Sequence, residues 1–240
     1  FLSWTNDVAR IFIDTSGESL SRRNYRSTSS SAPMQETLAA GIIEATKWEP
    51  GMHFINPMTG SGTLVIEAVM RAMNRAPASL RNNFGFMHIR GYDESHYQQV
   101  RSQAKQKIEK EIKGKFIATD NDPVAIISAK KNAKTAGVDH LIEFETCDFD
   151  KTTVPDGDGV VVFNPPYGVR LGDDRDLRPL YKSIGDFLKS HCARKTGYVF
   201  TDNSKLAKKI GLRAGSRTQF FNSTLECRLL EFDIYKGSKK

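Results

Sequence analysis

The residues with the clearest chemical potential lie in the stretch VVVFNPPYGVRL, residues 160–171. Its first residues suit a buried strand, and the two prolines end that strand because proline cannot donate to a sheet ladder. Asn164 would offer a side-chain carbonyl, and Pro165 a backbone carbonyl whose direction the rigid rings hold. Two such acceptors suit an exocyclic amine, which must rehybridise before it attacks a methyl group. Tyr167 could stack on the base that carries this amine. A plain strand-ending turn is the alternative.

A second candidate is the glycine-bearing turn NPMTGSGT, residues 56–63, between a short apolar stretch and a helical one. Gly60 and Gly62 would let the backbone approach a ligand, and a helix N-terminus offers unpaired N–H groups. No Gly-Lys-Ser/Thr follows, which excludes a P-loop, and the third glycine of a dinucleotide fingerprint is missing. The turn therefore indicates a nucleotide-type ligand, with a ligand-free strand–helix turn as the alternative.

Carboxylates follow the next two expected strands. Asp120, in ATDND, stands where a carboxylate can accept hydrogen bonds from both hydroxyls of a ribose. Asp122 is its rival, although Asp122 could instead cap the helix that begins at Pro123. Asp148, in TCDFD, could accept a hydrogen bond from an adenine amino group or be an ordinary surface carboxylate. Because parallel strands end at one edge of a sheet, these features predict a single site.

The elements that would position these residues alternate between strand-like and helical stretches. This alternation predicts an α/β fold, with a mostly parallel sheet and helices on both faces. We expect residues 75–94 to be irregular and one helix to stop at Gly137. The expected strands are 8–14, 53–56, 115–122, 142–149, 159–164, 196–203 and 225–237, and the expected helices are 33–48, 64–70, 97–113, 123–137, 177–192 and 204–212.

Composition suits one large domain or one domain with an extension. The chain has 240 residues, of which 39% are hydrophobic, enough for a core. Lys and Arg outnumber Asp and Glu by 35 to 28, which suits a polyanionic partner such as a nucleic acid, with a soluble basic enzyme of scattered charge as the alternative. Candidate RNA contacts, each of which could instead be solvated surface charge, are Arg22, Arg23, Arg26, Arg170, Arg175, Lys208, Lys209 and Arg213.

Cysteine and histidine usage argues against a disulfide framework or a metal site. Cys147, Cys192 and Cys227 are too few and too dispersed, so we interpret them as reduced thiols of a cytoplasmic protein. The five histidines show no metal-binding spacing, so we expect no metal. No apolar run reaches the ~18 residues that span a bilayer, so we expect no membrane association. The missing initiator Met suggests a fragment.

Four stretches together carry a family resemblance. They are DTSGESLSRRNYR, NPMTGSGTLVIEA, NPPYGVRL and LECRLLEFDIY, and the resemblance covers nearly the whole chain. The glycine turn and NPPYG resemble the class I, S-adenosylmethionine (SAM)-dependent amino-methyltransferases. The full set resembles the guanine-N2 RNA methyltransferases that usually carry an N-terminal THUMP domain, above all the bacterial 23S rRNA enzymes.

The resemblance implies a seven-stranded Rossmann-like methyltransferase domain at residues 33–240, preceded by an N-terminal strand and basic linker at 1–32. It implies SAM as the cofactor, ribosomal RNA or else tRNA as the partner, and a THUMP domain missing from this chain. Catalysis would fall to Asn164, Pro165 and Tyr167. The implied cofactor contacts are Pro33, Asn56, Gly60, Gly62, Thr63, Asp120, Asp148 and Asn164.

This sequence departs from the family pattern at two positions. Asn56 stands where many methyltransferases have an acid, and Thr59 stands where this family often has cysteine. Two other readings share much of the evidence, namely a DNA or RNA adenine-N6 methyltransferase and a non-catalytic RNA-binding module on the same scaffold. A nicotinamide-dependent dehydrogenase fails on the missing third glycine and on the lack of a catalytic Tyr/Lys or His pair.

Overall fold

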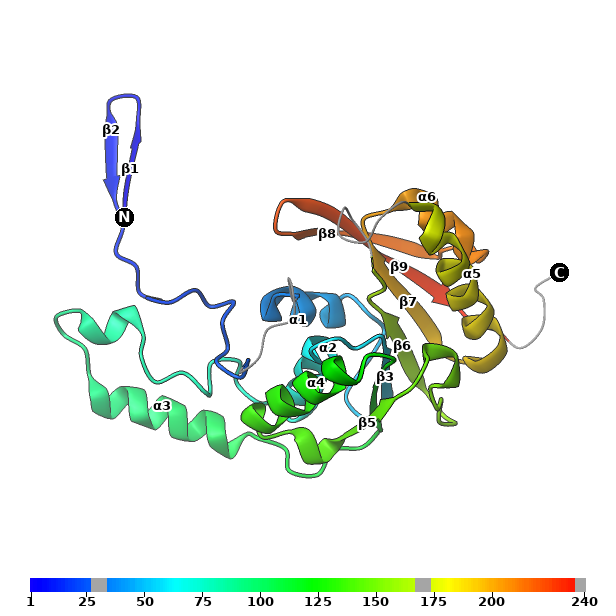
Figure 1. The fold of residues 1–240 in the computed structure, drawn as a ribbon. Coiled ribbons are helices and arrows are strands. Elements are labelled where there is room, and N and C mark those ends of the chain that lie inside the picture. The colour runs from blue at the N-terminus through cyan, green and yellow to red at the C-terminus, as the bar shows by residue number, and fades with distance from the viewer. Residues whose placement is uncertain (27–33, 167–173, 236–240) are drawn as a thin grey trace.

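The structure, a computed structural model, describes residues 1–26, 34–166 and 174–235. Its centre is a seven-stranded sheet in the order β5-β4-β3-β6-β7-β9-β8 (Figure 1). The strands are β3 (His53–Pro57), β4 (Phe116–Asp120), β5 (Ile142–Thr146), β6 (Gly159–Phe163), β7 (Thr196–Thr201), β8 (Ser216–Asn222) and β9 (Leu225–Asp233). The first five are parallel, and β9 runs antiparallel to both β7 and β8. The predicted mostly parallel α/β sheet is confirmed.

Helices cover both faces of this sheet. One apolar cluster joins the sheet to α1 (Glu36–Glu44), α2 (Thr63–Ala72) and α4 (Pro123–Ala136). The other joins it to α5 (Asp174–His191), α6 (Ser204–Ala207) and the 3-10 turn η5 (Lys208–Ile210). Successive residues of a strand point to opposite faces, so Phe54 belongs to the first cluster and Ile55 to the second. This two-sided burial explains the near-continuous apolar runs of the central strands.

Helix α4 shows how local sequence sets an element's ends. The Asp122 side chain accepts a hydrogen bond from the Val124 N–H at 2.8 Å, and Pro123 occupies the first turn. At the other end, Gly137 caps the helix with φ of 70°, as its sequence position predicted. Asp122 therefore serves as the helix cap, which was one of its two predicted roles.

Helix α5 and η5 approach each other unusually closely. A Cβ on Gly185 would lie 1.8 Å from the carbonyl oxygen of Ile210, so only glycine fits there. This contact fixes η5 against α5, and with it the turn that leads into β8.

The strand expected at 8–14 is present but shorter, and one strand was not expected. Strand β2 (Val8–Ile11) lies within the expected range and pairs with β1 (Leu2–Thr5) in a hairpin separate from the main sheet. Strand β8 was not expected at all. It is an edge strand whose residues are mostly exposed, so its sequence carries little of the apolar alternation that reveals a strand.

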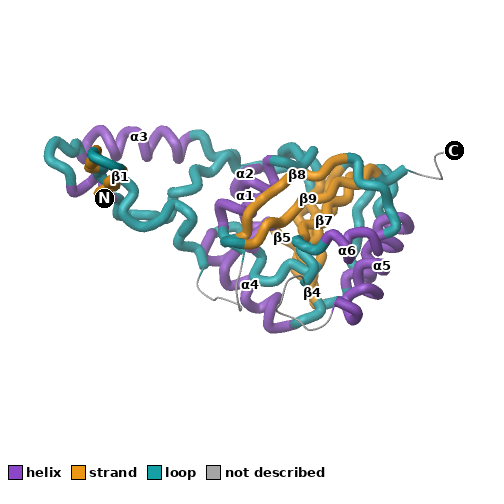
Figure 2. Tube along the Cα trace, turned by 90° about the horizontal axis from the view of Figure 1, so that it is seen from above, coloured by secondary structure: helices purple, strands orange, loops and turns teal. Residues whose placement is uncertain are grey.

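The N-terminal hairpin and α3 (Glu94–Gln106) lie away from the main sheet (Figure 1). They are at the opposite end of the molecule from α5 and α6 (Figure 2). Helix α3 buries none of its residues and ends earlier than the expected 113, and α1 is also shorter than the expected 33–48. The short 3-10 turns are η1 (Gly85–His88) within the stretch expected to be irregular, η2 (Asp139–Leu141) and η3 (Phe149–Lys151).

Candidate active site

The glycine turn joins β3 to α2 at the carboxyl edge of the sheet. Gly60 has φ of 56°, and a Cβ built on it would meet nothing within 4 Å, so this residue faces open space. Gly62 has φ of 81°, and a Cβ there would lie 3.0 Å from that of Ala129 on α4. The two glycines therefore serve different purposes. Gly60 keeps the ligand side of the turn clear, whereas Gly62 lets α2 and α4 pack together.

Asn56 holds this turn from beneath. It is fully buried, and its amide donates to the Val162 carbonyl of β6 at 2.8 Å. Its side-chain oxygen accepts from the Thr59 hydroxyl at 2.9 Å. An aspartate could not donate to the Val162 carbonyl, which gives a physical reason for the amide at this position. Both functional groups of Asn56 are used inside the protein, so it positions the turn.

Asp120 ends β4 directly beside the glycine turn. Its Oδ2 accepts from the Gly60 N–H at 2.9 Å, and its Oδ1 accepts from the Asp122 N–H at 3.1 Å. A carboxylate has about four lone-pair positions, so each oxygen retains capacity for a further donor. The half-buried Asp120 is thus oriented by the backbone and still able to accept from two hydroxyls.

Asp148 lies on the adjacent strand end, after β5. It is exposed, and its Oδ1 accepts from the Asn121 amide at 3.5 Å, a long hydrogen bond. The Cys147 N–H donates to the Asp120 carbonyl at 3.1 Å, which ties this loop to the end of β4. The structure therefore brings Gly60, Asp120 and Asp148 to one edge of the sheet, as their strand-end positions predicted.

The loop after β6 carries the most unusual polar atom of the site. Asn164 Oδ1 is buried, and the described part of the chain offers it no hydrogen-bond partner. Pro165 is buried beside it. The Pro166 carbonyl accepts from the Tyr181 hydroxyl of α5 at 3.3 Å, and Tyr181 pairs with the Thr201 hydroxyl at 2.9 Å. Tyr181 thus holds the loop at Pro166, while Asn164 Oδ1 can still accept a hydrogen bond from a ligand.

Three predicted site residues, Pro33, Tyr167 and Arg170, lie outside the described residues. Met34, beside the first of them, is buried, and its carbonyl accepts from Arg26 at 2.7 Å.

The RNA contacts expected of Arg23 and Arg26 are not supported. Arg23 is buried and forms an ion pair with the buried Glu67 at 3.3 Å. Arg26 pairs with Glu36 at 3.4 Å and donates to the Thr63 hydroxyl, the first residue of α2, at 3.3 Å. These arginines compensate carboxylates that the α1–α2 pair buries. Arg22 is exposed and forms an exposed ion pair with Glu18 at 2.9 Å, so of these three arginines it stays a candidate.

Burial beneath the turn raises the pKa values of two groups. Burial raises the pKa of the Glu67 carboxyl to about 7, although Arg23 and the Tyr25 hydroxyl partly oppose this. Burial, followed by the nearby Glu67 charge, also raises the pKa of Tyr25. Tyr25 is 1% exposed and part of the apolar core, so this residue of the predicted linker packs against the main domain. The domain boundary at 32/33 stays a prediction.

Other expected features can be placed more briefly. Cys147, Cys192 and Cys227 are free thiols. Within the described ranges, no group of three His, Cys, Asp or Glu side chains is placed to hold a metal ion. No helix in the same ranges combines the length and apolarity that a bilayer span requires.

Comparison with known protein families identifies the family of this chain. Residues 23–231 match the family model UPF0020, described as the RMKL-like methyltransferase domain. The chain belongs to this family. Its fold is therefore the Rossmann-like one of class I methyltransferases, as predicted.

Individual relatives agree with this assignment. The chain is 40% identical over 238 residues to the "Ribosomal RNA large subunit methyltransferase K/L" of Syntrophotalea carbinolica, covering 95% of this chain and 33% of that protein. The crystal structure of SMU.472 complexed with SAH matches with a TM-score of 0.89 and 31% identity, covering 99% of this chain and 62% of that one. This chain thus spans about a third of the length of the rRNA methyltransferase that it matches.

A further solved structure bears on the substrate. A "predicted N6-adenine-specific DNA methylase" from Listeria monocytogenes matches with a TM-score of 0.82 and 31% identity, covering 92% of this chain and 57% of that one.

Sequence reasoning missed several residues that shape the site. Tyr181 lies within an amphipathic helix, where nothing distinguishes it from a core residue. Thr201 ends β7, so its strand-end position was a usable signal. Thr59 was noted only as a departure from the family pattern, and the structure shows that its hydroxyl donates to the Asn56 side chain.

Proposed function

We propose that this chain is the catalytic domain of an enzyme that transfers a methyl group from SAM to an exocyclic amine of a base in RNA. The target that the evidence favours is guanine N2 of large-subunit ribosomal RNA. The family match and the name of the Syntrophotalea relative support the reaction class and the RNA. Ribosomal RNA as substrate would place the enzyme in the cytoplasm, and a THUMP domain would belong to the part of the whole protein outside this chain.

The observation that carries this proposal is the buried Asn164 Oδ1, which lacks a partner among the described residues. Leaving such an acceptor unpaired costs about 1–3 kcal/mol, so a fold retains it where a ligand donor completes it. It lies at the end of β6, next to β3 and its glycine turn in the sheet. An amine N–H at this point would supply the missing donor.

The residues at the sheet edge fit a nucleoside-bearing cofactor. Gly60 presents open space and Asp120 retains acceptor capacity, which suits the ribose, while Asp148 is exposed where an adenine amino group could reach it. The role proposed for Gly62, Thr63 and Asn56 is indirect: they are buried and shape the turn that would contact the cofactor. When bound, SAM supplies the electrophilic methyl group.

The protein's own part in the reaction is to orient and polarise the amine. Asn164 Oδ1 and the Pro165 carbonyl would each accept an N–H of the amine. Holding both hydrogens draws the nitrogen toward tetrahedral geometry and aims its lone pair. Alignment of the two reacting groups then supplies much of the rate enhancement. Tyr167, in the same loop, is proposed to stack on the base.

Adenine N6 is the second candidate target. It is also an exocyclic amine, so the same two acceptors would serve it, and the description of the Listeria structure favours it. The bases differ in the groups beside the amine, and no described contact distinguishes them.

Two linked measurements test the proposal. Calorimetric titration should give micromolar affinity for SAM and no binding of NAD, and absence of SAM binding would contradict the cofactor assignment. Incubation with labelled SAM and unmodified large-subunit rRNA, followed by nucleoside mass spectrometry, should yield N2-methylguanosine. N6-methyladenosine would instead move the proposal to the second target.

A further inference from the structure

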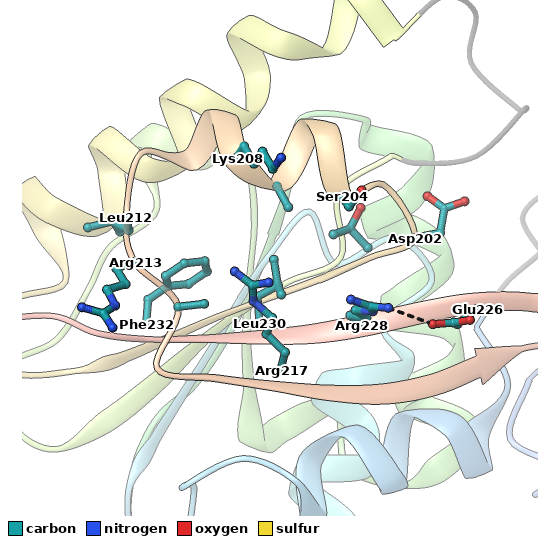
Figure 3. Close-up of a pocket in the computed structure, with 13 residues that line it drawn as sticks. Asp202, Ser204, Lys208, Leu212, Arg213, Arg217, Glu226, Arg228, Leu230 and Phe232 are labelled. Atoms are coloured by element: carbon teal, nitrogen blue, oxygen red, sulfur yellow. Dashed lines mark hydrogen bonds and ion pairs between the residues drawn. The ribbon is translucent and has the colours of Figure 1, made fainter.

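A cavity of about 540 Å³ lies beyond the proposed reaction site, between α6 and η5 on one side and β8 and β9 on the other (Figure 3). Four cationic residues line it, namely Lys208, Arg213, Arg217 and Arg228. Figure 3 shows Lys208 on the helical side and Arg217 and Arg228 on the strands that face it. The basic side chains thus converge on one hollow from three separate elements.

The charge of this cavity is unbalanced. Four cationic residues face two acidic ones, Asp202 and Glu226. Glu226 forms an ion pair with Arg228 at 3.1 Å. Lys208, Arg213 and Arg217 form no ion pair with any residue that the structure describes, and all three are exposed. The buried Arg23, by contrast, forms an ion pair with Glu67. The cavity therefore suits an anionic ligand.

An exposed aromatic ring shares this face of the sheet. In the β8–β9 register Arg217 lies opposite Leu230 and Phe221 opposite Glu226, so both side chains are on the cavity side with Arg228. Phe221 is 63% exposed, whereas its neighbour Phe220 turns inward and packs edge-on against Phe200. Core packing does not account for Phe221. Cations interleaved with an exposed aromatic ring are the usual means of holding single-stranded nucleic acid.

The cavity is also joined to the loop that would hold the target base. Thr201 lines the cavity, and its hydroxyl pairs with Tyr181. Tyr181 in turn donates to the Pro166 carbonyl, two residues after Asn164. The two hydrogen bonds of Tyr181 therefore connect the basic cavity to the proposed catalytic loop.

From these observations we infer that the cavity binds the phosphate backbone of the single-stranded RNA that flanks the target nucleotide, and that Phe221 stacks on one of its bases. This inference rests on the proposed function and adds to it the surface that holds the substrate. Lys208, Arg213 and Arg217 contact phosphates, and Arg228 joins them when it exchanges Glu226 for RNA. The β8 edge strand thus has a substrate-binding role.

The test compares two double variants with equal changes of net charge. Arg213→Glu/Arg217→Glu alters the cavity. Lys130→Glu/Lys134→Glu alters exposed residues of α4, which covers the other face of the sheet. Fluorescence anisotropy measures the affinity of each for a labelled single-stranded RNA between about 50 and 200 mM salt. Calorimetry with SAM and thermal melting are run in parallel.

The cavity variant should lose at least tenfold in RNA affinity at the lowest salt. The plot of log affinity against log salt should flatten by about 1.4, since each phosphate contact on a single strand contributes about 0.7. The α4 variant should retain the wild-type slope, and all three proteins should bind SAM equally and melt alike. Phe221→Ala should lower affinity without changing the slope, because stacking releases no counterions.

Two results would overturn the inference in distinguishable ways. If wild-type protein binds RNA and the cavity variant binds it with the same affinity and slope, the cavity assignment is wrong and the proposed function stands. If wild-type protein binds SAM but no RNA, both the cavity assignment and the RNA substrate fail.

Discussion

Two halves of the sheet's carboxyl edge differ in how far their polar groups are satisfied. At β3 and β4, Asn56, Thr59 and Asp120 all have internal partners, and the turn hydrogen bonds are 2.8–2.9 Å long. At β6 and β7, Asn164 Oδ1 is buried without a partner among the described residues. Three exposed cations of the adjacent cavity, Lys208, Arg213 and Arg217, form no ion pair with those residues either. The named polar groups of the first half already have protein partners, whereas Asn164 Oδ1 in the second half would gain its first partner from a ligand.

This difference indicates a division of labour. A pre-formed turn suits a cofactor that every reaction cycle uses in the same way, because no ordering cost arises on binding. Polar groups that lack a protein partner suit a substrate whose hydrogen bonds strengthen as the reaction proceeds. Substitutions in the first half should therefore lower stability or cofactor affinity, and those in the second should lower turnover or RNA binding.

The largest effect on stability should come from the charge network beneath the cofactor turn. Arg23→Ala leaves Glu67 buried without its cation, which should lower the free energy of unfolding by about 3–5 kcal/mol above pH 7. The exposed Arg22–Glu18 pair is the matched control, and Arg22→Ala should cost no more than about 1 kcal/mol. Urea unfolding at pH 8 measures both. Equal effects would mean that the buried pair does not support the turn.

A smaller effect is expected at the ribose position. Asp120→Asn removes a charged acceptor from the Gly60 N–H and should weaken SAM binding by about 1.5–3 kcal/mol. Asp122→Asn is the control, because asparagine caps helices nearly as well as aspartate. Its SAM affinity should stay near that of the wild type. Normal SAM affinity in the Asp120 variant, as measured by calorimetry, would remove Asp120 from the cofactor site.

The third prediction concerns the pH dependence of stability. Glu67 has a folded-state pKa of about 7, raised by burial from 4.5, so the folded protein binds its proton more tightly than the unfolded chain does. Stability from this group is therefore greatest below pH 4.5 and falls as pH rises toward 7, by up to about 1.4 kcal/mol per pH unit. Glu67→Gln should flatten this part of the curve of unfolding free energy against pH. An unchanged slope would show that another group causes it.

Strand-end motifs were predictable because parallel strands bring their carboxyl ends together whatever the remaining sequence. The placement of Gly60, Asp120, Asp148 and Asn164 at one edge of the sheet was predicted in this way, and their roles there stay predictions. The helix stop at Gly137 was also predictable, since left-handed backbone favours glycine locally.

The errors came from properties that depend on distant parts of the chain. Arg23 and Arg26 look like surface cations in a serine-rich stretch, and only the packing of α1 against α2 reveals the buried carboxylates that they neutralise. The role of Asn56 depends on the Val162 carbonyl, 106 residues away. Strand β8 escaped notice because an exposed edge strand has little apolar periodicity.

The central claim is tested most directly by comparing two asparagines at the ends of adjacent strands, each replaced by alanine. Asn164→Ala should lower the methylation rate of bound rRNA about 10²–10³-fold, equivalent to about 2.7–4 kcal/mol of barrier, while SAM affinity and stability stay near wild type. Asn56→Ala should instead lower the free energy of unfolding, because it removes the hydrogen-bond partner of the buried Val162 carbonyl and of the Thr59 hydroxyl. An unchanged single-turnover rate in the Asn164 variant, with SAM and RNA bound, would contradict the account.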